Sequence, residues 1–143
     1  MPRPGVVLDT SVIVSAHLKQ DGLERFVLDL ALSRAITIHV SEEIFEEYTG
    51  VLSRSRFGIP PQLVKNSLGL IKQAATFVQA KRIGTLDLDP DDNKFLDCVA
   101  ETEADYLVTG NKRHFPKIWG KTRVVSAREL LQDLIPILKG RAD

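Results

Sequence analysis

Short apolar runs mark the strands that this sequence predicts. Residues 6–8, 106–109 and 123–125 are mostly aliphatic with little polar alternation, which is typical of strands buried on both faces of a parallel sheet. Residues 36–40 alternate in polarity and are rich in β-branched side chains, which favours another strand. The stretch 76–88 is ambiguous and includes a short strand near residues 77–78.

Between these strands, apolar residues recur at helical spacing. Helices are expected at residues 12–18, 23–33, 42–52, 61–75, 92–102 and 130–138. Ser41 is placed to cap the third of these helices, and Pro61 occupies a first helical position, where proline is tolerated. Ser126 and Glu129 have the spacing of a capping box, and Pro136 is expected to kink or end the last helix. Strands that alternate with helices predict an α/β fold with a mostly parallel central sheet.

The composition fits one domain over residues 1–143, with 43% hydrophobic residues to build a core. The 19 basic and 19 acidic side chains cancel, which argues against non-specific coating of nucleic acid but allows a local basic rim. The single Cys98 forms no intrachain disulfide, no signal peptide precedes the first strand, and no apolar run reaches membrane-spanning length. We therefore expect a soluble cytoplasmic protein that does not bind membranes.

The first candidate for chemistry is Asp9, which directly follows the first predicted strand. Ligands of open α/β sheets bind at the carboxyl ends of the strands, so this carboxylate is well placed to act as the first acid of a metal site. The alternative is structural, because Asp followed by Thr10 and Ser11 is also good turn and helix-capping chemistry.

Two further acids lie at the edges of helical apolar stripes. Glu47 flanks the stripe of its helix, whereas Glu46 lies nearly opposite and should face water. Asp92 heads a core-facing stripe on the next candidate helix, while Asp91 and Asp97 are expected to point elsewhere. The alternatives are a surface or Arg-paired Glu47, and an Asp92 that serves only the helix dipole or cap.

The loop after the strand at residues 106–109 adds polar groups beside the same edge. Thr109 and Asn111 end this strand, and Gly110 allows a sharp turn between them. Basic side chains follow at Lys112, Arg113, His114, Lys117, Lys121 and Arg123, as an ordinary solvated loop or as phosphate contacts. His114 is either a general base or a surface and phosphate-contact residue.

Three carboxylates that converge on one sheet edge would repel one another unless a cation bound between them. Oxygen ligands without His or Cys favour Mg²⁺ or Mn²⁺ over zinc. Such an ion aligns a water nucleophile and stabilises the leaving oxygen in phosphodiester hydrolysis.

Four segments together resemble the PIN domain (PilT N-terminus) family of metal-dependent ribonucleases, and in particular the PIN toxins of toxin–antitoxin pairs. The segments are residues 7–11 (VLDTS), 41–48 (SEEIFEEY), 89–96 (DPDDNKFL) and 104–116 (ADYLVTGNKRHFP). The order and spacing of these segments are specific, although no single segment is. The resemblance spans residues 6 to about 134.

The resemblance implies a three-layer α/β/α fold, often a homodimer, that hydrolyses RNA with a metal-activated water. Its three acids fall on Asp9, Glu47 and Asp92 as metal ligands, and its fourth falls on Asn111, an amide that supplies no charge to a second metal ion. Hydroxyls of Thr10 or Ser11 would support the acids. An antitoxin protein would block the site.

Two other functions remain open on the sequence. One is a PIN-fold module that binds RNA or a protein partner with weak or lost catalysis, which Asn111 and the zero net charge favour. The other is a different α/β protein with a strand-end Asp. A phosphatase is disfavoured because Ser11 replaces the second acid of the Asp-x-Asp pair, and a receiver domain because its paired acids and late Lys are missing.

Overall fold

The computed structural model describes residues 3–81 and 90–142. Its strands form one sheet in the order β3-β2-β1-β4-β6-β5, in which all neighbours are parallel except β5 and β6. The strands are β1 (Gly5–Leu8), β2 (Thr37–Ser41), β3 (Thr76–Val78), β4 (Tyr106–Val108), β5 (Ile118–Trp119) and β6 (Thr122–Val125). The α/β fold with a mostly parallel sheet is therefore confirmed.

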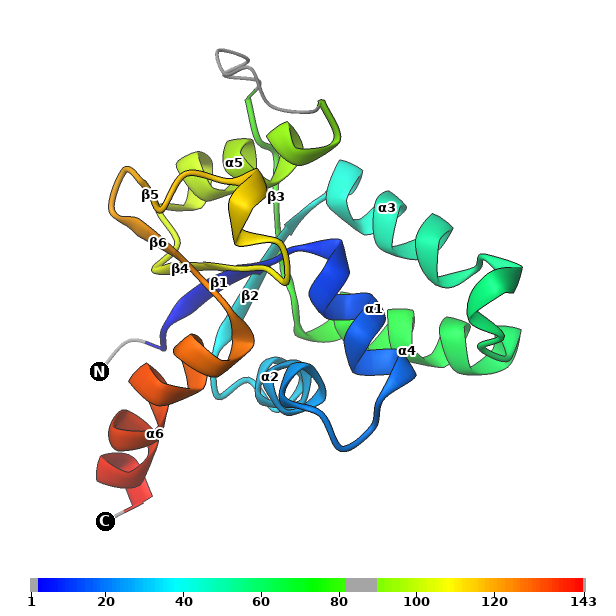
Figure 1. The fold of residues 1–143 in the computed structure, drawn as a ribbon, viewed down its shortest axis with the longest axis horizontal. Helices are drawn as coiled ribbons and strands as arrows, with labels where there is room; N and C mark the ends of the chain where they lie inside the picture. Colours follow the sequence, from blue (N-terminus) through cyan, green and yellow to red (C-terminus); the bar gives the residue numbers. More distant parts are fainter. Residues whose placement is uncertain (1–2, 82–89, 143) are drawn as a thin grey trace.

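Helices cover both faces of this sheet. They are α1 (Thr10–Leu18), α2 (Leu23–Leu32), α3 (Glu42–Leu52), α4 (Pro61–Ala74), α5 (Pro90–Thr102) and α6 (Ala127–Ala142), with short 3₁₀ turns η1 (Ser55–Phe57) and η2 (Lys112–His114). Figure 1 shows α5 on one side of the sheet and α2 and α6 on the other. This arrangement confirms the three-layer α/β/α architecture.

β1 lies at the centre of the sheet because its side chains are apolar on both faces. Val6, Val7 and Leu8 are fully buried, and the strand pairs with β2 on one side and β4 on the other. From β1 the chain adds β2 and β3 in one direction and then returns to add β4 and β6 in the other. The carboxyl ends of β1 and β4 thus form the switch point at which open α/β sheets bind ligands.

Two helix starts use the capping groups expected from the sequence. The Ser41 hydroxyl accepts a hydrogen bond from the Ile44 amide at 3.3 Å at the start of α3. At α6, the Glu129 amide donates to the Ser126 hydroxyl at 3.1 Å, while the Ser126 amide donates to the Glu129 carboxylate at 2.9 Å. The capping box at Ser126 and Glu129 is confirmed.

Three elements differ from the sequence-based expectation. Helix α6 continues through Pro136 to Ala142 rather than ending near residue 138. Proline removes the donor to the carbonyl of Gln132, which is an exposed residue. Helix α5 begins at Pro90, two residues earlier than expected, and Asp89 lies outside the described residues. The short β5 was not predicted. None of the described helices is both long and apolar enough to cross a membrane.

His17 joins α1 to α4 in its neutral form. Its Nδ1 donates to the Ile13 carbonyl at 2.7 Å, and its Nε2 accepts from the Ser67 hydroxyl at 2.5 Å. Burial lowers the pKa of His17, and the hydrogen bond to the Ile13 carbonyl offsets only part of this effect. Protonation of the ring would remove the acceptor that Ser67 uses.

We expect this linkage to make the fold less stable in mild acid. The pKa of His17 in the folded protein lies below the unfolded value of 6.5. The contribution of neutral His17 to the free energy of unfolding is therefore complete above pH 6.5 and is lost as the pH falls through the folded pKa. The slope is at most about 1.4 kcal/mol per pH unit for one proton. The free energy of unfolding should be measured with urea at several pH values between 8 and 5. Its fall with decreasing pH should be shallower in His17→Gln than in the wild type. Equal slopes would contradict this role.

Candidate active site at the carboxyl edge of the sheet

Asp9 follows β1 and is 7% exposed. Although it occupies the N-cap position of α1, its carboxylate makes no capping hydrogen bond. Instead Oδ2 accepts hydrogen bonds from the hydroxyls of Ser11 and Thr109, both at 2.7 Å. Among the described residues Oδ1 has no hydrogen-bond donor. The carboxylate is therefore fixed through one oxygen, and the structural alternative of a simple helix cap does not describe it.

The loop after β4 is tied to the start of α1. Thr109 is almost fully buried, and its hydroxyl also accepts a hydrogen bond from the backbone amide of Asn111 at 2.9 Å. The Gly110 amide donates to the Ser11 hydroxyl at 3.0 Å, and a Cβ at Gly110 would lie only 3.4 Å from that oxygen. That distance is an ordinary van der Waals contact, so the loop and the start of α1 are packed directly against each other. The Asn111 side chain is exposed at this edge and has no hydrogen-bond partner within the described part of the chain.

Glu47 projects from α3 toward the same edge. Its side chain is 19% exposed, whereas neighbouring Glu46 faces solvent, so the predicted phase of this helix is confirmed. Oε2 accepts a short hydrogen bond from the Thr10 hydroxyl. Oε1 accepts from the Lys94 ammonium at 2.8 Å. Glu47 therefore joins the residue after Asp9 to helix α5, and the expected support from the hydroxyl groups of Thr10 and Ser11 is present.

Lys94 is the site residue that sequence reasoning missed. It extends from α5, is 17% exposed and forms its ion pair across 47 positions of sequence. The available signal was its spacing, because Lys94 precedes the fully buried Cys98 by four residues and therefore lies on the same helix face. A lysine on a core-facing stripe needs an acidic partner.

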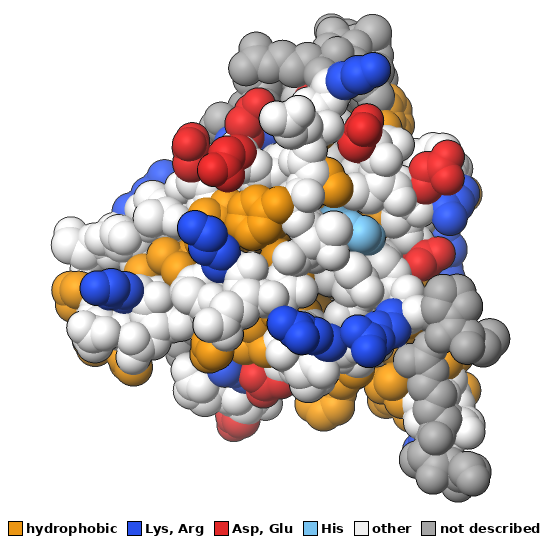
Figure 2. Space-filling view, turned by 180° about the vertical axis from the view of Figure 1, so that it is seen from behind, with side chains coloured by type: hydrophobic (Ala, Val, Ile, Leu, Met, Phe, Trp, Pro, Cys, Tyr) orange, Lys and Arg blue, Asp and Glu red, His pale blue; other side chains and the backbone are white. Residues whose placement is uncertain are grey.

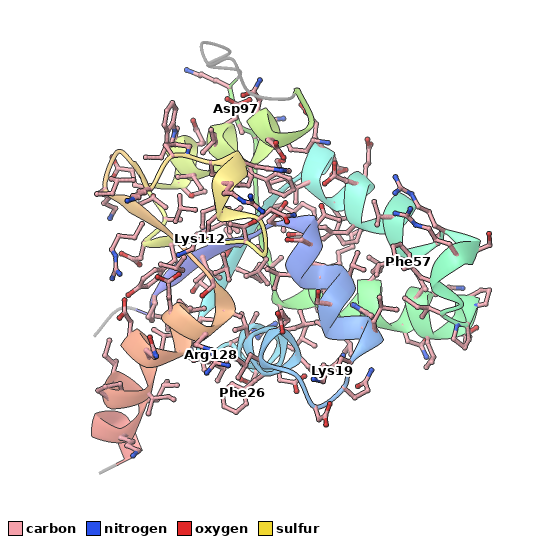
Figure 3. All side chains as sticks on the ribbon, viewed as in Figure 1. Lys19, Phe26, Phe57, Asp97, Lys112 and Arg128 are labelled. Carbon is pink, nitrogen blue, oxygen red and sulfur yellow. The ribbon has the colours of Figure 1, made fainter. Side chains whose placement is uncertain are left out.

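Asp92 opens the same helix with its side chain 19% exposed. Its Oδ2 lies 3.9 Å from Nδ1 of His114, which brings the loop after β4 close to α5. Asp97, which was expected to point elsewhere than the stripe headed by Asp92, is nevertheless largely buried. It is only 9% exposed on α5, where it is labelled in Figure 3. The side chain of Asp91 lies outside the described residues.

Tyr48 anchors the end of the strand that precedes Asp9. It is fully buried, and its hydroxyl donates to the carbonyl of Leu8, the last residue of β1. Burial raises the pKa of Tyr48 well above its usual value, and the negative charge of Asp9 adds to the effect. The phenol is therefore protonated at neutral pH and can donate this hydrogen bond. This contact fixes the strand end that carries Asp9.

The donor set suits a hard divalent ion held by few protein ligands. Within residues 3–81 and 90–142, no group of three or more His, Cys, Asp or Glu side chains is placed to hold a metal ion together. Asp9 nevertheless offers a carboxylate oxygen without a donor at the switch point. Mg²⁺ commonly binds through one or two carboxylates and keeps several waters. The residues present therefore fit such an ion, with Glu47 already committed to Lys94 and Thr10.

The basic loop beyond Asn111 is partly neutralised. Lys112 pairs with Glu129 at 2.7 Å and Arg123 pairs with Asp133 at 2.5 Å, both on α6. The Lys112 contact and the Ser126 amide lower the pKa of Glu129 to about 2. On the face shown in Figure 2, acidic and basic side chains lie in small separate groups rather than in one basic surface. On this face, therefore, no continuous basic surface of the kind that coats nucleic acid non-specifically is seen.

A groove of about 300 Å³ is lined by Ser11, Ser15, Thr109, Gly110 and Arg128, among others, but not by Asp9, Glu47 or Asp92. A larger groove, of about 1160 Å³, lies along β3 and includes His39 and Phe77 but none of the candidate acids. The smaller groove is the more relevant one, because it shares Ser11 and Thr109 with the hydrogen-bond network around Asp9.

Comparison with known proteins identifies the class to which this fold and site belong. The PIN domain matches residues 5–113, which is most of the chain, so this protein belongs to the PIN domain family. PIN domains are generally nucleases, which are hydrolases. No curated protein shows significant similarity to the sequence.

A solved structure with a similar fold is that of VapBC2 from Rickettsia felis bound to a DNA fragment from their promoter. The two chains are 15% identical with a TM-score of 0.56, and the match covers 84% of this chain and 96% of the other. At this level of identity the similarity shows the fold alone.

Proposed function

We propose that this protein is a Mg²⁺- or Mn²⁺-dependent endoribonuclease. The observation that carries the proposal is the Asp9 carboxylate, which is buried at the β1–β4 switch point and held through one oxygen by Ser11 and Thr109. A carboxylate that merely capped α1 would use that oxygen on the amides of the helix. Family membership supports nuclease chemistry at this edge.

In this proposal Asp9 and Asp92 bind the metal ion, and Glu47 orients the attacking water. When bound, a divalent cation supplies a Lewis acid for the phosphate and makes water a better nucleophile. Thr10 and Lys94 hold Glu47, leaving its remaining lone pairs for a water proton. The Asn111 amide contacts bound water or the ion without adding charge, and His114 lies close enough to Asp92 to approach the substrate phosphate.

The choice of RNA over DNA, and of a toxin role, rests on the resemblance to PIN toxins. As a toxin the protein would act in the cytoplasm as a single-domain homodimer, and a cognate antitoxin would cover the Asp9 edge. The fold similarity to a chain of the VapBC2 structure is consistent with such a partner. Induced expression should then arrest growth in a way that depends on Asp9.

Cleavage of nucleic acid by the purified protein tests the proposal. A mixed RNA pool and a single-stranded DNA pool of matched lengths are incubated with Mg²⁺, with Mn²⁺ and with chelator. We expect internal cleavage of RNA with either metal ion and none with chelator. RNA cleavage that persists in excess chelator would contradict metal dependence, and cleavage of DNA alone would contradict the proposed substrate.

A binding module is the second candidate function. It is favoured by the pairing of Glu47 with Lys94 and by Asn111 at the place of a fourth acid. RNA binding without cleavage by folded, partner-free protein in every metal condition would support this function instead.

A further inference from the structure

Lys94 places a fixed positive charge inside the acidic site. Its ammonium lies 2.8 Å from Glu47 Oε1, and both side chains are more than four-fifths buried, with exposures of 17% and 19%. The two residues come from different helices, α5 and α3, so the contact depends on the tertiary fold. An ion pair with this little solvent around it holds its geometry more firmly than an exposed surface pair.

This ammonium changes the charge that a metal ion meets. Asp9, Glu47 and Asp92 supply three negative charges, and Lys94 removes one of them. Asn111, at the place of a fourth acid, adds none. For these described side chains alone, two net negative charges remain, which one divalent ion balances and two would exceed.

The contacts of Glu47 agree with this charge balance. One oxygen accepts from Thr10 and the other from Lys94, so both carboxylate oxygens are occupied by protein donors. Among the described residues, no three His, Cys, Asp or Glu side chains are grouped so that they could hold a metal ion together. The Lys94 ammonium thus occupies the position next to Glu47 that a second metal ion would otherwise take.

We propose that Lys94 is a positioning residue that acts as a built-in cation, holding Glu47 and limiting the site to one divalent metal ion. The inference rests on the metal-dependent function proposed above and specifies the number of metal ions that the site binds. It predicts that loss of the Lys94 charge opens the Glu47 side of the site to metal, without requiring any change in fold.

Mn²⁺ binding without RNA tests this inference directly. Titration of free Mn²⁺ by electron paramagnetic resonance should give one bound ion per wild-type chain. Lys94→Met should bind a second ion or bind the first at least about tenfold more tightly, because a positive charge near a divalent ion has been removed. Lys94→Arg keeps the charge and should bind one ion with wild-type affinity. RNA cleavage at saturating Mn²⁺ should fall in Lys94→Met, because Glu47 loses its partner.

The matched control is Lys19→Met, since exposed Lys19 follows the far end of α1 and is labelled well away from α5 in Figure 3. It makes the same charge change and should leave Mn²⁺ binding unaltered. Thermal melting checks that each variant is folded. If Lys94→Met does not fold, Lys94→Gln, which keeps polarity but not charge, serves in its place with the same expected result.

Several results would overturn the inference. These are two ions bound by the wild type, no ion bound by the wild type, or identical Mn²⁺ binding by wild type and the uncharged Lys94 variant. If the last result occurs while the wild type cleaves RNA, only the role of Lys94 fails. If the variant gains Mn²⁺ as expected but the wild type cleaves no RNA, the role of Lys94 stands and the proposed ribonuclease function fails.

Discussion

Asp9→Asn is expected to reduce metal-dependent RNA cleavage at least about 100-fold while the protein stays folded. Loss of even a supporting group around a metal typically costs about 10–100-fold in affinity or activity, and Asp9 is proposed as a direct ligand. The Asn oxygen can still accept from Ser11 and Thr109, so the local network survives. Removal of a buried negative charge should keep the free energy of unfolding within about 1 kcal/mol of the wild type or increase it.

Asp21→Asn is the matched control, because Asp21 is exposed in the turn after α1. Initial rates of RNA cleavage and urea unfolding curves should be measured for both variants. We expect wild-type cleavage in Asp21→Asn. Undiminished cleavage in a folded Asp9→Asn protein would remove Asp9 from the site.

Neighbouring acids on α3 give the second large effect. Glu47→Gln should lower cleavage by about 10–100-fold, whereas Glu46→Gln should leave it within about twofold of the wild type. The reason is that Glu47 contacts Thr10 and Lys94, while Glu46 faces water. Glu47→Gln should also destabilise the fold by about 1–2 kcal/mol, because it leaves the largely buried Lys94 charge without a carboxylate partner.

This pair of variants carries its own control, since the two substitutions are chemically identical and adjacent. Cleavage rates at saturating Mg²⁺ and unfolding midpoints are the measurements. If Glu46→Gln lost activity and Glu47→Gln kept it, the functional face of α3 would be assigned wrongly.

Local periodicity was sufficient to predict the fold class and which of Glu46 and Glu47 faces water. The apolar run before Asp9 predicted a central strand, and β1 is fully buried. The stripe of α3 separated Glu47 from Glu46, which differ in exposure as expected. These features depend on residues within one turn or strand, where the physical pattern is carried by neighbours in sequence.

Contacts between distant segments could not be predicted in the same way. The pair of Glu47 and Lys94 depends on how α3 packs near α5, which no local period encodes. Burial of Asp97 depends in the same way on what surrounds α5. Of the two outcomes expected at Pro136, the helix does not end there, and a kink stays a prediction; exposed Gln132 is the residue whose carbonyl loses the Pro136 donor.

The central claim is that the Asp9 edge performs metal-dependent cleavage of RNA. Its most direct test is one gel that compares wild type and Asp9→Asn on the mixed RNA pool, first in chelator and then after Mg²⁺ is restored in excess. The account predicts that cleavage appears only in the wild type and only after Mg²⁺ is added. Equal cleavage by both proteins, or no cleavage by folded wild type free of partners, would contradict it.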